Sequence, residues 1–240
     1  MASNEPAHDA GGRRRRVAPG DTARLLFAQA RAWVRATPGT HTWLLVLAVT
    51  SGVLEAVPPH IRGFLLHHNS TNLEELGSHP VRVLIVSALW IESPPAFLVY
   101  FLFYEIVHAP AERRLGTRRW LAVVALAHVG ATLISQQAVF LGIHADRLSP
   151  SLAHTVDIGV SYGLAGVAGV LTYLLRPPWR WAYLAAVAGC LAYPLLQPGR
   201  TYTDLGHVTA LLIGLACRGL TRPGRAAPEP RRCRPRRWRP

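Results

Sequence analysis

Two apolar stretches of the chain carry polar side chains whose types could perform nucleophilic and acid–base chemistry. The first, DIGVSYGLAGVAGVL, contains Asp157 and Ser161, and the second, TDLGHVTALLIGLA, contains Asp204 and His207. A serine hydroxyl beside an imidazole is the minimal nucleophile and base pair, and a carboxylate can orient the base. Ser161 and His207 are therefore the candidate catalytic residues, with Asp157 and Asp204 as candidate orienting groups.

Each of these residues also has a structural explanation that must be weighed. A serine in a transmembrane helix commonly bonds back to the backbone of its own helix, and stripes of small residues mostly serve helix packing. An ionisable residue within the membrane is nonetheless a functional hypothesis by default. Small residues beside the polar ones are expected to let the two helices approach closely, and they are Gly159, Gly163, Ala165, Gly169, Ala210 and Gly214.

The distribution of apolar residues predicts the elements that must position this pair. Half of the 240 residues are hydrophobic, and they form blocks rather than an amphipathic pattern. A membrane-spanning helix needs roughly 17 to 25 residues. Six blocks reach or approach that length, at about 41–57, 83–109, 119–142, 153–175, 179–196 and 204–220. The sequence thus predicts an all-α polytopic membrane protein with a six-transmembrane-helix bundle over residues 40–220.

The net charge of +13 would suit nucleic acid, but the positions of the arginines argue for membrane topology instead. Twenty-two of the 26 basic residues lie before residue 40, within 111–119, within 176–180, or from Arg218 onward. Because cytoplasmic loops carry the excess of positive charge, both termini are predicted to be cytoplasmic and the protein to lie in the plasma (inner) membrane. Membrane lipids are the expected partners, and nucleic acid is not.

The segments outside the bundle are predicted from composition. Residues 1–20 form a polar, arginine-rich cytoplasmic arm, and residues 221–240 form a basic cytoplasmic tail, both expected to be disordered. Residues 21–38 combine apolar and arginine positions at helical spacing, which predicts an amphipathic helix at the membrane surface. The paired prolines in IESPPAF predict a break in the second block, with the span itself starting near Ala96.

The longest external loop contains several histidines, which raises the question of a metal. They are His60, His67, His68 and His79. No H-x3-H spacing and no companion cysteine accompanies them, and loop histidines are usually solvated. The sequence therefore predicts no metal site and no cofactor.

At the serine and histidine, the chain resembles the rhomboid family of intramembrane serine proteases. GVSYG is similar to the family's G-x-S-G, whose serine is the nucleophile, and GHVTALLIGLA is similar to the A-H-x-x-G helix that supplies the base. AERRLGTRRWLAVVALAHVG is similar to the family's E-x-x-x-G turn and the helix after it. The resemblance covers roughly residues 40–220 and implies the bacterial six-helix form, with transmembrane segments of client proteins as substrates.

The resemblance also marks departures that weaken the implied chemistry. Ala96 and Tyr100 occupy the positions of the family's oxyanion-binding His and Asn. Tyr162 replaces the second Gly of G-x-S-G, Ala210 replaces the Gly of A-H-x-x-G, and Ala165 replaces a Tyr that stacks on the histidine. Since losing one oxyanion donor typically costs about 10²- to 10³-fold in rate, the implied oxyanion hole is weakened to Tyr100 and the Ser161 amide.

Three functional hypotheses follow from these residues. The first is an intramembrane serine endopeptidase that uses Ser161 and His207. The alternative is a catalytically inactive rhomboid-like protein that binds transmembrane clients, which the lost oxyanion donors favour. A small transporter with a polar path along Asp157, Ser161, Asp204 and His207 is a third, although the chain shows no internal repeat.

Overall fold

The structure is a computed structural model that describes residues 19–221, and within that range every regular element is helical. This confirms the predicted all-α class for the described residues. The α-helices are α1 (Pro19–Ala36), α2 (Pro38–Ala56), α3 (Pro59–His68), α4 (Leu73–Ser78), α5 (Pro80–Val86), α6 (Phe97–Phe103), α7 (Ala109–Leu115), α8 (Thr117–His144), α9 (Val160–Leu171), α10 (Trp179–Ala192) and α11 (Tyr202–Ala216). Short 3-10 or π segments are η1 (Ser87–Leu89), η2 (Pro94–Ala96), η3 (Tyr104–His108), η4 (Pro150–His154), η5 (Thr172–Leu174), η6 (Tyr193–Leu196) and η7 (Cys217–Thr221).

Helix α1 belongs to a compact unit of its own, separate from the unit that begins at Thr37. It covers most of the helix predicted over 21–38 and ends at Ala36, because Pro38 starts α2 at a position that suits proline. Its large apolar side chains Leu25, Leu26 and Phe27 are exposed, and its place at a membrane surface stays a prediction. The predicted arm and tail lie outside the described residues, apart from residues 19–20 and 221.

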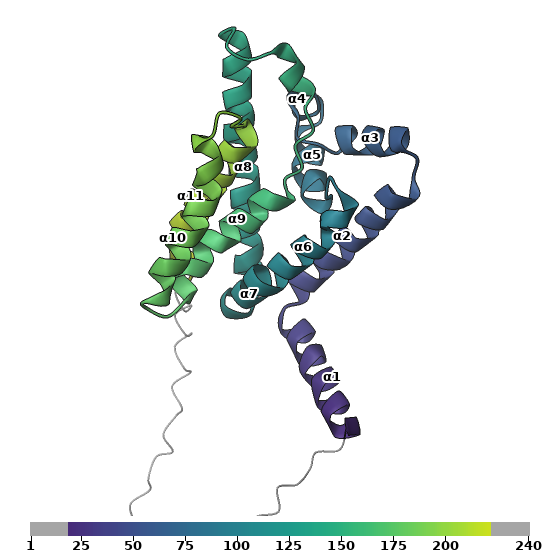
Figure 1. Ribbon diagram of the computed structural model, residues 1–240, viewed down its shortest axis with the longest axis vertical. Helices are drawn as coiled ribbons and strands as arrows, with labels where there is room; N and C mark the ends of the chain where they lie inside the picture. The colour runs from purple at the N-terminus through teal and green to yellow at the C-terminus, as the bar shows by residue number, and fades with distance from the viewer. Residues whose placement is uncertain (1–18, 222–240) are drawn as a thin grey trace, which may run out of the picture. The chain divides into compact units, whose positions relative to one another are not determined.

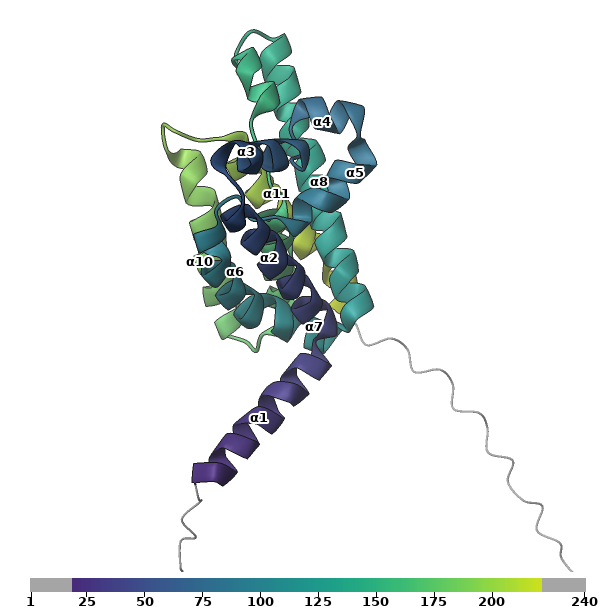
Figure 2. The same ribbon diagram turned by 90° about the vertical axis from the view of Figure 1, so that its right-hand side faces the viewer.

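Helices α8, α9 and α11 form the centre of the second unit, where α9 contacts both α8 and α11 (Figure 1). Figure 2 shows α11 beside α8 in the turned view. The sequence of α9, VSYGLAGVAGVL, is rich in small residues, so neighbouring backbones can come close. At Gly214 an added Cβ atom would lie 1.9 Å from the carbonyl oxygen of Gly166. At Gly169 it would lie 2.5 Å from the carbonyl oxygen of Leu211. The α9–α11 crossing therefore rests on direct backbone contact.

The predicted small-residue stripe divides between two neighbours. Gly169, Ala210 and Gly214 lie at the α9–α11 contact, whereas Gly163 faces Val124 of α8. Gly159 also faces α8, where His128 takes the space that a side chain would need. Ala165 joins a small buried cluster between the helices. The stripe therefore packs α9 against α8 as well as against α11.

Apolar helices lie in all six of the predicted blocks, but they differ in length. Among the described residues, α8 alone is long and apolar enough to cross a membrane as one uninterrupted helix. The segments Pro80–Leu89 and Pro94–Leu115 meet the same requirement together, with a bend of 63° between them. This bend falls at the break predicted from the paired prolines, since Pro94 opens η2. A bundle with six spans stays a prediction.

The turn between α7 and α8 fastens α2 to this bundle. Glu112 is buried and accepts hydrogen bonds from the backbone N–H groups of Gly39 and Thr40 at 2.8 and 2.7 Å. It also accepts from Thr117 Oγ1 at 2.7 Å. Gly116 has φ +79°, a backbone conformation that favours glycine. The glutamate and glycine of the E-x-x-x-G turn thus hold the start of α2 beside the start of α8.

Candidate functional site

The hydroxyl of Ser161 and the imidazole of His207 are in direct contact. Ser161 lies in the first turn of α9, and His207 lies in the first half of α11. Ser161 Oγ is 2.9 Å from His207 Nε2, a normal hydrogen-bond length for these atoms. Both residues are half-buried. The close crossing of α9 and α11 brings together the two residues that the sequence singles out for nucleophilic chemistry.

An aromatic ring supports His207 from the side. The ring of Tyr162 meets the His207 ring edge to face, with centroids 5.3 Å apart and 66° between the planes. Aromatic pairs favour such geometry. Gly206 provides the room, because a Cβ atom there would lie 2.6 Å from the Tyr162 ring. In the family pattern this ring comes from position 165, which is alanine here. The sequence analysis therefore did not identify Tyr162, directly after Ser161, as the ring beside His207.

The sequence pattern predicts Asp157 on the same helix as Ser161, one turn before it. This prediction is wrong. Asp157 belongs to the extended segment that precedes α9, and the helix begins only at Val160. The reason is lateral hydrogen bonding by its backbone: Asp157 N donates to Ser70 Oγ at 2.7 Å, and Asp157 O accepts from Thr71 N at 3.0 Å. These bonds to the segment before α4 replace the helical ones.

The Asp157 carboxylate orients Tyr162 and makes no hydrogen bond to His207 in the described structure. It is 3% exposed and accepts from Tyr162 Oη at 3.0 Å and from Gln136 Nε2 at 3.0 Å. A hydroxyl bonded to a buried carboxylate has its ring held in one orientation. Asp157 therefore acts on His207 through the Tyr162 ring, which differs from the direct carboxylate contact that the sequence suggested.

Asp204 caps α11. Its Oδ2 atom accepts from the backbone N–H of Thr201 at 2.7 Å and from Thr201 Oγ1 at 2.9 Å, which completes a capping box at the helix start. Such a cap satisfies N–H groups that have no partner inside the helix. Of the two carboxylates near the dyad, Asp157 thus orients the Tyr162 ring and Asp204 completes the capping box of α11.

A small polar cavity of about 240 Å³ opens beside the dyad. Its lining includes Ser161, His207, Tyr100 and Glu92. Tyr100 lines the same cavity as Ser161 and His207, so its hydroxyl lies near the reacting atoms. Ala96, at the end of η2, packs against an apolar cluster, and its methyl group can donate no hydrogen bond. Of the two expected oxyanion positions, Tyr100 alone can supply a donor.

A family model described as rhomboid-like protein matches residues 32–227 of the chain. The chain belongs to this family. Neither the search of curated proteins nor the search of solved structures found a match. The resemblance predicted from GVSYG and GHVTALLIGLA is confirmed, and membership in the rhomboid-like family makes the chain a membrane protein built as a helical bundle.

This rhomboid-like protein contains a second contact between a serine and a histidine. Ser87 Oγ lies 3.3 Å from His128 Nε2, and the same nitrogen lies 2.8 Å from the carbonyl oxygen of Leu84. A carbonyl oxygen only accepts, so Nε2 of His128 must carry a proton and cannot take one from Ser87. His207 Nε2 faces only a hydroxyl among its hydrogen-bond partners in the described structure. The contact at Ser87 is therefore structural.

No group of metal-ligating side chains lies at the dyad in the part of the chain that the structure describes. The histidine and carboxylate groups that come close enough to share an ion belong to α3, α4 and η4. What the dyad region offers is a hydroxyl and an imidazole in contact, with a phenol lining the same cavity, and a nucleophile beside a base suits acyl transfer.

Proposed function

We propose that this rhomboid-like protein is an intramembrane serine endopeptidase that cleaves transmembrane segments of client proteins. The observation that carries the proposal is the 2.9 Å contact between Ser161 Oγ and His207 Nε2. Geometry comes before acidity in choosing a general base, and a base must lie within about 2.6 to 3.2 Å of the proton it takes. The pair meets that requirement.

The reaction needs two half-steps, and these residues supply the proton transfers for both. Ser161 Oγ attacks the scissile carbonyl carbon while its proton passes to His207 Nε2, and a tetrahedral oxyanion forms. His207 then gives that proton to the leaving amine, the C–N bond breaks, and the acyl group remains on Ser161. Water, deprotonated by His207, attacks the ester, and the ester bond to Ser161 breaks as its oxygen regains a proton.

Two donors are available for the oxyanion. Ser161 lies in the first turn of α9, where backbone N–H groups have no acceptor inside the helix and the helix dipole favours negative charge. Tyr100 lines the cavity beside Ser161 and adds a hydroxyl as the second donor. Both donors are fixed by helices, so they need little reorganisation when the charge develops.

The proposal includes the predicted topology of six spans with cytoplasmic termini. Two hydrogen bonds place the arginines of the α7–α8 region beside the ends of other helices: Arg114 donates to the carbonyl of Leu174, and Arg119 donates to that of Leu220. In Figure 1, α7 lies at the end of the bundle opposite to α4. Because arginine collects on the cytoplasmic side, the α4 end and its histidines face outward.

A second candidate function is client binding without cleavage, and two observations favour it. Ala96 offers no hydrogen-bond donor, and the carboxylate of Glu92 lines the cavity where an oxyanion would form. A negative charge there opposes the developing charge of the intermediate. In this case the cavity and helix surfaces hold a transmembrane client, and the dyad performs no reaction.

A fluorophosphonate probe distinguishes the two functions, because it reacts only with an activated serine. The full chain in detergent is expected to be labelled, Ser161→Ala to lose all labelling, and His207→Ala to lose most of it. Ser87→Ala serves as the matched control and keeps full labelling. If the folded wild-type chain is not labelled while an active rhomboid protease is labelled in parallel, the endopeptidase proposal fails and client binding takes its place.

A further inference from the structure

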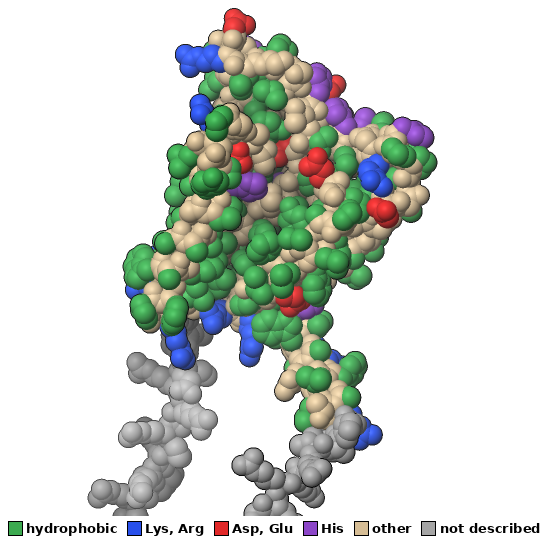
Figure 3. All heavy atoms as spheres, in the orientation of Figure 1, with side chains coloured by type: hydrophobic (Ala, Val, Ile, Leu, Met, Phe, Trp, Pro, Cys, Tyr) green, Lys and Arg blue, Asp and Glu red, His purple; other side chains and the backbone are tan. Residues whose placement is uncertain are grey.

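Three elements far apart in the sequence bring histidine and glutamate side chains to one point near the α4 end of the bundle. His67 lies in the last turn of α3, Glu74 lies in the first turn of α4, and His154 ends η4. Glu74 Oε2 lies 2.8 Å from His154 Nδ1 and 3.8 Å from His67 Nε2. All three atoms fall within 4.8 Å of one another. Figure 3 shows histidine side chains gathered beside a carboxylate on this surface.

The distances match the requirements of a zinc ion. Tetrahedral zinc with bonds of about 2.0 to 2.2 Å places its donor atoms about 3.3 Å apart. The two distances to Glu74 lie on either side of that value. The rings of His67 and His154 are nearly parallel, with 18° between their planes, and both point a nitrogen at the same carboxylate oxygen. Each of the two distances to Glu74 would change by about 0.5 Å to reach that separation.

A neighbouring set of residues is less suitable. His67, His68 and Glu75 also come within 4.8 Å of one another. However, Glu75 is buried and already accepts a hydrogen bond from Arg82 at 2.6 Å, so its charge is matched by a fixed cation. A guanidinium beside a carboxylate repels a second cation. Glu74 instead lies beside two histidines, His67 and His154, and these can release a proton when a metal binds.

We propose that His67, Glu74 and His154 form a zinc site on the external face of the protein. Two imidazole nitrogens and one carboxylate oxygen suit zinc among the divalent metals, and a water molecule would complete the tetrahedron. The side chains of Glu74 and His154 are more than half exposed, at 53% and 59%, so an ion can enter from solvent. This inference does not depend on whether the dyad is catalytic.

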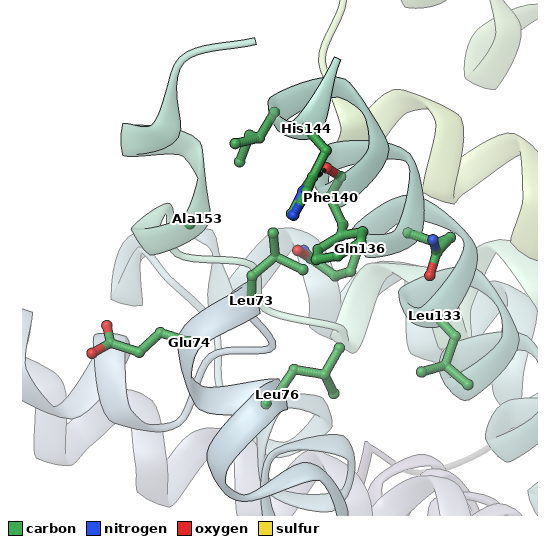
Figure 4. Close-up of a pocket in the computed structure, with 11 residues that line it drawn as sticks. Leu73, Glu74, Leu76, Leu133, Gln136, Phe140, His144 and Ala153 are labelled. Atoms are coloured by element: carbon green, nitrogen blue, oxygen red, sulfur yellow. Dashed lines mark hydrogen bonds between the residues drawn. The ribbon is translucent and has the colours of Figure 1, made fainter. Parts of the chain in front are cut away.

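Bound zinc would fasten the same two segments that Asp157 connects. His154 is followed after two residues by Asp157, whose backbone bonds to Ser70 and Thr71. The ion would join the end of η4 to α3 and α4 at one point, and Asp157 joins that segment to the residues before α4 at another. An apolar hollow of about 560 Å³ lies between α4, η4 and α8. Figure 4 shows Glu74 and Ala153 at its rim, with the Glu74 carboxylate directed away from it. Zinc would therefore fix the rim of this hollow.

The test measures zinc binding directly. The full chain, carrying no polyhistidine tag and stripped with a chelator, is titrated with Zn²⁺ in competition with a chromophoric indicator. One ion is expected to bind, and His67→Ala, Glu74→Gln and His154→Ala are each expected to weaken binding by at least about 10-fold. His60→Ala is the matched control on α3, because His60 is exposed and stands outside both sets, and it should bind as the wild type does.

A second measurement separates loss of binding from loss of folding. Zinc should raise the thermal unfolding midpoint of the wild type and of His60→Ala, and should leave that of His154→Ala unchanged, while all three unfold at similar temperatures without zinc. Absence of saturable zinc binding by the wild type overturns the proposal. It is equally overturned if His68→Ala abolishes binding while His154→Ala retains it, or if His60→Ala weakens it as much as the proposed ligands do.

Discussion

The α9–α11 crossing sets the distance between Ser161 and His207, and Gly214→Ala tests this dependence most directly. A Cβ atom at Gly214 would lie 1.9 Å from the carbonyl oxygen of Gly166, where real Cβ atoms stay beyond 3.0 Å. That oxygen belongs to a helix backbone, so no change of rotamer relieves the clash. The two helices must move apart by at least about 1 Å.

Such a movement should be visible in the reactivity of the serine. The hydrogen bond between Ser161 Oγ and His207 Nε2 is 2.9 Å long, and adding about 1 Å takes it beyond hydrogen-bonding distance. A misplacement of about 1 Å at reacting groups costs on the order of 10²-fold in rate. We therefore expect the rate of fluorophosphonate labelling to fall about 100-fold in Gly214→Ala, with a lower thermal unfolding midpoint in detergent.

Gly189→Ala provides the matched control. Gly189 lies within α10, and an added Cβ there would meet nothing within 4 Å. Because alanine favours the helix over glycine by about 1 kcal/mol, this variant should keep the wild-type labelling rate and should not unfold at a lower temperature. If Gly214→Ala labels at the wild-type rate and unfolds at the same temperature, the crossing does not set the dyad distance and the reasoning is wrong.

Substitutions at three further residues separate the roles of the groups that support the dyad and the bundle. Tyr162→Phe keeps the ring beside the histidine but removes the hydroxyl bonded to Asp157, so it should lower the free energy of unfolding by about 1.5 to 3 kcal/mol. It should slow labelling less than Tyr162→Ala does. Equal labelling rates for the two variants would contradict the role of the ring. Asp204→Ala removes the carboxylate half of the capping box of α11. Chemical denaturation should show a loss of about 1 kcal/mol with little change in labelling, whereas a loss of labelling without a loss of stability would mean that Asp204 acts on the base. Glu112→Gln puts an NH₂ donor where the carboxylate accepts three hydrogen bonds, so unfolding should become easier by about 1 to 3 kcal/mol, and an unchanged midpoint would refute its anchoring role.

Local pattern was enough to predict the helical class, the break before Ala96 and the contact between Ser161 and His207. Each of these depends on a signal inside one segment: a block of apolar residues, a pair of prolines, or a serine and a histidine flanked by small residues. The contact of Ser161 with His207 could be expected because both stripes of small residues occur at helical spacing. Family membership then agreed with the order of the motifs along the chain.

The sequence could not predict contacts between segments that carry no motif or stripe of small residues. Asp157 was expected on a helix, because nothing in its neighbourhood indicates that Ser70 and Thr71 bond to its backbone. The spacing of the loop histidines gives no sign of a metal site. Nor does it indicate that Glu74 and His154, 80 residues apart in the sequence, are in contact. Periodicity describes one segment at a time and carries no information about such pairs.

Three departures from the rhomboid pattern become consistent with one another once the ring contacts are known. The family pattern has a tyrosine one turn after the nucleophile, and here that residue is Ala165. Tyr162 stands where the pattern has glycine, and its ring reaches His207 from that position. The ring fits only because Gly206 replaces the alanine of A-H-x-x-G, since even a methyl group there would lie 2.6 Å from it. The Tyr162 ring thus occupies the side of His207 where the family pattern places its tyrosine ring, and this agrees with the proposed role of His207 as the base.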